Sequence, residues 1–165
     1  MVVKLRLSLW FVVALLLAGC NEEMTAPKTG QTAPAFSLER LDGSRAEFPG
    51  DLSGKVVAIQ FWADWCPPCI NEMILLAPVY QQYQSQGLVI LAVNMRQDKA
   101  TVAKLVTQLD APYEFLLDIS GKVADDYGVT ALPTSFIVDR KGILKTRILG
   151  ESTPKTFEKI IQGLL

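Results

Sequence analysis

The stretch FWADWCPPC, residues 61–69, decides the fold of this 165-residue chain. It follows the apolar run VVAI, residues 56–59, and places two thiols one helical turn apart. This order predicts a buried strand that leads into a helix with a Cys-x-x-Cys pair in its first turn. A thiolate at a helix start is stabilised by the peptide dipoles and by unpaired N–H groups, which lower its pKa. We therefore interpret Cys66 and Cys69 as a redox-active pair.

Other interpretations of the two thiols are weaker. A purely structural disulfide that closes so short a loop adds little stability. A zinc site needs four ligands, and the sequence contains no His and only one further Cys, Cys20. A copper relay could use two thiolates, but no His or Met motif accompanies them. We expect no metal and no separate cofactor, because the pair itself carries the redox equivalents.

The first nineteen residues predict where this chemistry takes place. Lys4 and Arg6 precede a short apolar segment, residues 7–18, which ends in Leu17-Ala18-Gly19-Cys20. Small residues directly before a Cys resemble a bacterial lipoprotein signal, so we expect a signal peptide over residues 1–19 and lipidation of Cys20. Several acyl chains would anchor the protein stably to a lipid bilayer. The alternative is an uncleaved N-terminal anchor with a buried Cys20.

Charge and composition indicate a single acidic domain. Without residues 1–19 the chain has 14 Lys and Arg against 17 Asp and Glu, a net charge of −3, so we expect no nucleic acid partner. Residues 20–32 are polar and contain Pro27 and Gly30, as in a flexible tether. Residues 33–165 have the size of one domain.

Strand and helix patterns alternate along that domain. The helix after the thiols has an apolar stripe, and further helices are predicted to begin at Asp98, a candidate N-cap, and at Thr153, which Pro154 follows. Strands are predicted over residues 35–38, 46–48, 56–62, 88–93, 115–117, 135–138 and 143–149. The pattern predicts an α/β fold with a central mixed β-sheet flanked by helices.

The order of these elements, with Trp65-Cys66-Pro67-Pro68-Cys69 early and GVTALPT (residues 128–134) late, resembles the TlpA/ResA-type thioredoxin-like thiol-disulfide oxidoreductases. The resemblance covers residues 33–165. It implies a thioredoxin fold that has an N-terminal β-hairpin and an inserted strand-helix unit at about residues 98–117.

The resemblance also implies roles for individual residues. Cys66 matches the exposed attacking thiol and Cys69 the buried resolving thiol of the family. Pro133 matches a cis-proline that faces the thiols and leaves the backbone of Leu132 free to bind an extended substrate. Substrate contacts are further expected from residues beside the thiols: Trp65, Pro67 and Pro68. We expect Trp62 to serve in packing.

Glu72 has two interpretations. It matches an acidic residue that the family places near its thiols, and it also fits a solvated first-turn Glu favoured by the helix dipole. Thioredoxin has a buried, proton-accepting Asp at the position of Gln60, and Gln cannot titrate. If a carboxylate manages the proton of Cys69, Glu72 is the candidate.

The resemblance implies a membrane-anchored oxidoreductase facing the periplasm or another extracytoplasmic space. We expect it to reduce disulfide-containing proteins, for example in cytochrome c biogenesis, with electrons from a membrane electron-donor protein. A thiol oxidase or isomerase would use the same thiols. A thiol peroxidase and a non-enzymatic peptide- or copper-binding module are further alternatives.

Overall fold

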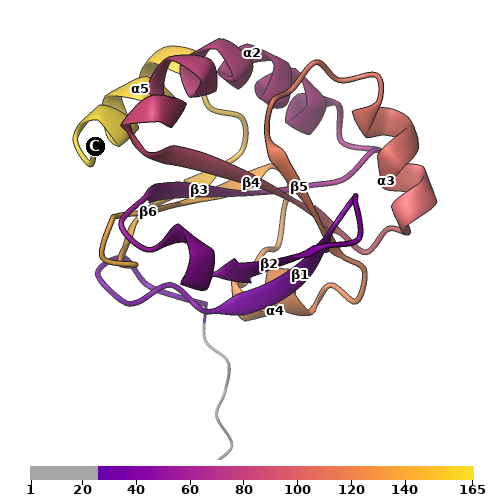
Figure 1. Ribbon diagram of the computed structural model, residues 1–165, viewed down its shortest axis with the longest axis horizontal. Helices are drawn as coiled ribbons and strands as arrows, with labels where there is room; N and C mark the ends of the chain where they lie inside the picture. The colour runs from indigo at the N-terminus through magenta and orange to yellow at the C-terminus, as the bar shows by residue number, and fades with distance from the viewer. Residues whose placement is uncertain (1–25) are drawn as a thin grey trace, which may run out of the picture.

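A seven-stranded mixed β-sheet, with strand order β2-β1-β5-β4-β3-β6-β7, forms the centre of the protein (Figure 1). The computed structural model describes residues 26–165. The expected signal peptide, Cys20 and the first residues of the expected tether lie outside this range.

Three parallel strands form the middle of the sheet, and antiparallel pairs complete it on both sides. Parallel neighbours are β3 (Val56–Trp62), β4 (Leu88–Met95) and β5 (Glu114–Asp118). The outer strands are β6 (Thr134–Val138) and β7 (Leu144–Leu149) beside β3, and β1 (Phe36–Arg40) and β2 (Arg45–Phe48) beside β5. All seven residues of β3 are buried, as a strand covered on both faces requires.

Helices cover both faces of this sheet. On one face lie α2 (Pro67–Tyr83), α3 (Lys99–Val106) and α5 (Pro154–Gln162), packed over a core that includes Trp62 and Phe157. The other face packs against the short α4 (Lys122–Asp126), and its core includes Phe61, Tyr127 and Phe136. The alternation of Phe61 and Trp62 between the two cores follows from the two-residue period of a strand. Two short 3-10 turns, η1 (Gly50–Leu52) and η2 (Gln84–Gln86), complete the fold.

Side-chain caps begin two of the helices where the sequence predicts them. Asp98 accepts a hydrogen bond from the Thr101 N–H at 2.9 Å, which starts α3. Thr153 accepts one from the Thr156 N–H at 3.2 Å, and Pro154 occupies the first position of α5. Each cap satisfies an N–H group that has no partner within its helix.

The predicted thioredoxin-type α/β fold is confirmed, including the N-terminal hairpin. The inserted unit consists of α3 followed by β5, so its helix precedes its strand. Hydrogen bonds of the domain begin earlier than residue 33, because the Gly30 N–H donates to the Leu144 carbonyl at 2.8 Å. Neither the helix α4 nor the cis Phe48–Pro49 peptide bond is expected from the sequence.

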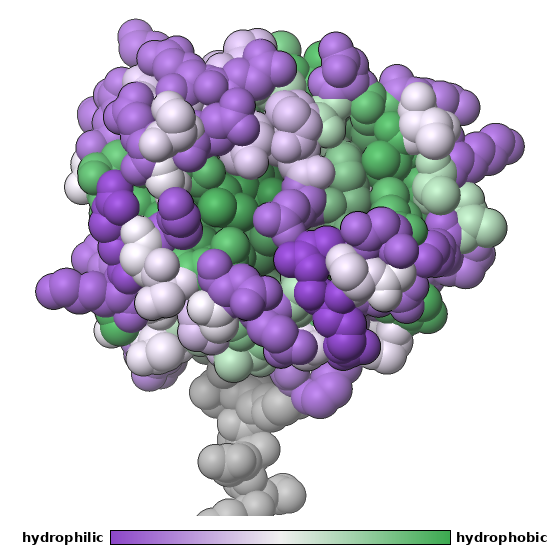
Figure 2. Space-filling model, in the orientation of Figure 1, coloured by the Kyte–Doolittle hydropathy of each residue, from purple (hydrophilic) through white to green (hydrophobic). Residues whose placement is uncertain are grey.

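The surface is mostly polar on the side shown in Figure 2, with apolar surface in a band between the upper helices and the β1–β2 hairpin. Within residues 26–165, none of the helices combines the length and the apolar character needed to span a membrane.

Candidate active site

The two thiols lie where β3 passes into α2, and they form a disulfide. Cys66 is the N-cap residue of α2, and the Cys69 N–H donates to the Cys66 sulfur at 3.3 Å. Pro67 and Pro68 fill the intervening positions and have no N–H group. The first backbone donor after Cys66 is therefore the Cys69 N–H, and it supplies the one backbone hydrogen bond to the Cys66 sulfur.

Exposure differs between the two cysteines, although both are buried. Cys66 keeps 4% of its surface accessible and Cys69 keeps 0%. Cys66 is thus slightly more accessible than Cys69, but it is not the exposed thiol that the resemblance implies, because in the disulfide form it belongs to the helix-covered core. Exposed residues surround the pair: Trp65, which is 68% accessible, Pro67 and Pro68. Trp62, by contrast, is fully buried against Phe115, which confirms its packing role.

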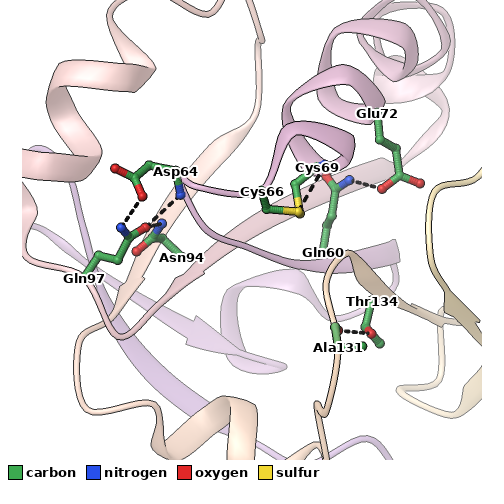
Figure 3. The surroundings of a disulfide bond; sticks show 9 residues. All are labelled: Gln60, Asp64, Cys66, Cys69, Glu72, Asn94, Gln97, Ala131 and Thr134. Carbon is green, nitrogen blue, oxygen red and sulfur yellow. Dashed lines mark hydrogen bonds between the residues drawn. A yellow bond between two sulfur atoms is a disulfide. The ribbon is translucent and has the colours of Figure 1, made fainter.

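The Leu132–Pro133 peptide bond is cis, as predicted from the resemblance. The next residue, Thr134, pairs with Phe61 of β3, so this segment lies beside the turn that carries the thiols. Figure 3 shows the segment from Ala131 to Thr134 below the disulfide. The Pro133 carbonyl accepts from the Gly150 N–H at 2.9 Å, whereas the backbone of Leu132 forms no hydrogen bond with any described residue.

The side chain of Glu72 lies on the inner face of α2 and is completely buried. One carboxylate oxygen accepts from the Ser152 N–H at 2.7 Å and from the Ser152 hydroxyl at 2.6 Å. The other oxygen accepts from the Gln60 amide nitrogen at 2.6 Å. The interpretation of Glu72 as a solvated surface residue is therefore wrong, because the helix turns this side chain toward the sheet and the loop before α5.

The orientation of the Gln60 amide follows from its partner. A carboxylate can only accept, so the NH₂ group must face Glu72 and the amide oxygen points away from it. Gln60 is 2% accessible, and its Oε1 has no hydrogen-bond partner among the described residues. Such a buried, unpaired acceptor is uncommon in folded proteins.

Tyr113 fixes the same part of α2 from another direction. Its hydroxyl donates to the Met73 carbonyl at 2.7 Å. Burial, followed by the charge of Glu72, raises the pKa of Tyr113. The phenol therefore keeps its proton and its hydrogen bond across the neutral range.

A second polar group holds the loop before Cys66. The Gln97 side-chain oxygen accepts from the Asp64 N–H at 2.9 Å and from the Asn94 amide at 2.8 Å, and the Gln97 amide donates to the Asp64 carboxylate (Figure 3). This link joins the end of β4 to the active-site loop. No pattern in the sequence identified Gln97 or Ser152, because each lies far along the chain from its partner.

No group of three or more His, Cys, Asp or Glu within the described range is arranged to hold a metal ion.

Comparison with known proteins agrees with this geometry. The model of the AhpC/TSA family matches residues 29–147. The thiol-disulfide oxidoreductase ResA of Geobacillus thermodenitrificans is 36% identical over 142 residues, which cover 86% of this chain and 81% of the relative. ResA of Bacillus subtilis is 36% identical over 124 residues, which cover 75% of this chain and 69% of that relative.

The chain belongs to the AhpC/TSA family and, within it, to the ResA-type thiol-disulfide oxidoreductases. A solved structure leads to the same conclusion. The crystal structure of a candidate DsbE thiol:disulfide interchange protein from Chlorobium tepidum has a TM-score of 0.75 and 30% identity, and the match covers 83% of this chain and 95% of that one. This ResA-type protein is thus a thiol-disulfide oxidoreductase whose active-site disulfide is Cys66–Cys69.

The buried position of Glu72 leads to a first prediction. Glu72→Gln should slow disulfide exchange near neutral pH and change its pH profile, because Gln cannot take up or release a proton. The fold should survive, since the Gln60 amide can turn its unpaired oxygen toward the new NH₂ group, at a cost of about 1 kcal/mol. Exchange rates measured between pH 5 and 9, together with urea unfolding, check both parts. Unchanged rates over that range would contradict a role in proton transfer.

Proposed function

We propose that this protein is a lipid-anchored, extracytoplasmic reductase of protein disulfides. The observation that supports this direction most directly is the start of α2, where the Cys66 sulfur receives the Cys69 N–H and neither intervening residue adds a donor or a charge. Strong oxidants of the superfamily carry a His between the thiols, which stabilises the thiolate and hence the reduced form. With less stabilisation of the thiolate, the reduced pair gives up its electrons more readily.

The proposed reaction is thiol–disulfide exchange in two steps. The Cys66 thiolate attacks one sulfur of the substrate disulfide, which releases the other substrate sulfur and forms a mixed disulfide. Cys69 then attacks the Cys66 sulfur, which releases the reduced substrate and leaves the Cys66–Cys69 disulfide. The greater accessibility of Cys66 supports this assignment of roles. Glu72, buried on the same helix as Cys69, is the proposed proton acceptor for the Cys69 thiol.

The proposed substrate site lies beside the cis-proline. The free backbone of Leu132 could pair with an extended segment of substrate next to Pro133, which is a strand-addition mode of recognition. The exposed side chain of Trp65 and the exposed rings of Pro67 and Pro68 would contact the same segment. The substrates in this proposal are proteins that carry a disulfide in an accessible, extended stretch.

A reductase needs a supply of electrons. The chain contains three cysteines, and Cys20 is the proposed lipidation site, so the Cys66–Cys69 pair needs an external reductant. We propose a membrane electron-donor protein for this step. Reduction of apocytochrome c thiols before haem attachment, a role that the TlpA/ResA resemblance implies, is the proposed use of the reducing equivalents.

The reduction potential tests the direction. Full-length protein carrying Cys20→Ser, in which only Cys66 and Cys69 can titrate, should equilibrate with dithiothreitol or glutathione at a potential nearer about −270 mV, the thioredoxin value, than about −120 mV. The oxidised fraction at equilibrium gives this potential. A value above about −180 mV, the level of protein disulfide isomerase, would favour the oxidase or isomerase alternative.

A trapping experiment tests the roles of the two thiols and identifies the substrates. Cys69→Ala should accumulate mixed disulfides between Cys66 and substrate proteins in cells, because no second thiol resolves them. Cys66→Ser, which lacks the proposed attacking thiol, should accumulate none and is the matched control. Equal yields from the two variants would contradict the assignment. Full function of Cys66→Ser in cells would favour a non-enzymatic binding module.

The anchor is tested separately. The mature protein should begin at Cys20 and carry acyl chains there, because Leu17-Ala18-Gly19-Cys20 has the pattern of a lipoprotein cleavage site. Mass spectrometry of the membrane fraction measures the mass of the N-terminal peptide. An intact Met1 terminus or an unmodified Cys20 thiol would contradict the proposed processing. Cys20→Ser should release the protein from the anchor and leave exchange rates unchanged.

A further inference from the structure

Ser152 directs both of its donor groups at Glu72, which lies eighty positions earlier in the sequence. Ser152 is 5% accessible and directly precedes Thr153, the N-cap residue of α5. The turn that begins α5 therefore also supplies two of the three hydrogen bonds to the buried carboxylate. A serine is not needed here to begin the helix, because Thr153 performs that role through its own hydroxyl.

Gln60 completes the set from the sheet. The alternation of β3 places Gln60 on the same face as Ala58 and Trp62, beneath α2. Cys69 and Glu72 are three residues apart and lie on the buried face of that helix. In the view of Figure 3, the Gln60 amide lies between the disulfide and the Glu72 carboxylate. Its unpaired oxygen is on the side of the amide that does not bind Glu72, and in that view this side of Gln60 faces the disulfide.

We propose that Ser152 and Gln60 are positioning residues for disulfide exchange, which hold the Glu72 carboxylate beside Cys69, and that Gln60 Oε1 accepts the S–H of Cys69 once the disulfide opens. This inference rests on the role proposed for Glu72. A disulfide sulfur has no hydrogen to donate, so the acceptor is without a partner in the oxidised form. Reduction supplies the missing donor.

The Cys66–Cys69 disulfide opens when a thiol reductant attacks it. A thiol of the reductant loses its proton, and its sulfur forms a bond with the Cys66 sulfur. The Cys66–Cys69 bond breaks, and its electron pair stays on the Cys69 sulfur, which takes up a proton through Glu72, the reverse of the transfer proposed for resolution. The proton that the attacking thiol released makes good the one that Glu72 delivers, so protons and electrons balance. The resulting Cys69 S–H is the donor that Gln60 Oε1 lacks in the oxidised structure.

A set of variants tests the position of Ser152. Ser152→Ala removes one of three donors to Glu72 and keeps the backbone N–H. Ser152→Thr keeps the hydroxyl. Thr153→Ala removes the α5 cap and leaves all three donors to Glu72 in place, so it controls for a general disturbance of this turn. The measurement is the pH dependence of reduction of the full-length protein by dithiothreitol, corrected for the fraction of dithiothreitol thiolate.

Ser152→Ala should move the Glu72-dependent limb of this profile to higher pH by about one unit, because the ionised carboxylate loses one of the hydrogen bonds that stabilise it. Ser152→Thr and Thr153→Ala should match the unmodified protein, and Ser152→Ala should have no further effect in a Glu72→Gln background. An equal shift in Thr153→Ala, or no shift in Ser152→Ala, would overturn the inference about Ser152. If the Glu72→Gln profile is changed at the same time, the role proposed for Glu72 itself still stands. A normal Glu72→Gln profile would remove both.

The S–H group of Cys69 tests Gln60 directly. Full-length protein with Cys20→Ser and Cys66→Ser retains Cys69 as its one thiol. The S–H stretching band in its infrared spectrum should lie at the lower frequency of a hydrogen-bonded thiol. Gln60→Met, which has a similar volume and no amide oxygen, should move the band up to the frequency of a free thiol. An unchanged band would show that Gln60 is not the acceptor and would overturn this part of the inference.

Discussion

A carboxylate that is removed from water must find its hydrogen-bond donors inside the protein, or its burial costs several kcal/mol. Glu72 meets this requirement with donors from two other parts of the chain, Gln60 on β3 and Ser152 before α5. The active-site helix, the central strand and the last helix are therefore held together at one point. This point lies one helical turn after Cys69, so the requirement that orders the packing also places a polar group next to the sulfur chemistry.

Local signals were sufficient for most of the fold. The continuous apolar run of β3, the caps Asp98 and Thr153 and the Pro at the start of α5 each act over a few residues, and the structure confirms them. The cis bond before Pro133 has no local signal of that kind, since few X-Pro bonds are cis, and it was predicted from the resemblance alone. The five-residue helix α4 is too short to show a helical period, and this explains why it was missed.

The surroundings of the thiols were less predictable, because they depend on contacts between distant segments. The sequence left Glu72 equally suited to solvent and to the interior, and only its contact with Ser152 and Gln60 decides between them. The link from Gln97 to Asp64 spans 33 positions and joins two loops that become neighbours only when β3 and β4 pair. Residues of this kind stabilise the site without any pattern of their own in the sequence.

In the proposed exchange reaction, the two prolines between the cysteines also affect how long a complex with substrate lasts. Proline fixes its own φ angle near the helical value, so the first turn of α2 is already formed when the disulfide is open. With the Cα atoms of Cys66 and Cys69 5.3 Å apart in a rigid turn, Cys69 meets a mixed disulfide on Cys66 at a high effective concentration. Resolution then competes well with dissociation or attack by outside thiols. In the proposed reaction, covalent complexes with partner proteins would be brief for this reason, and the partners would be released before a stable interface has to form.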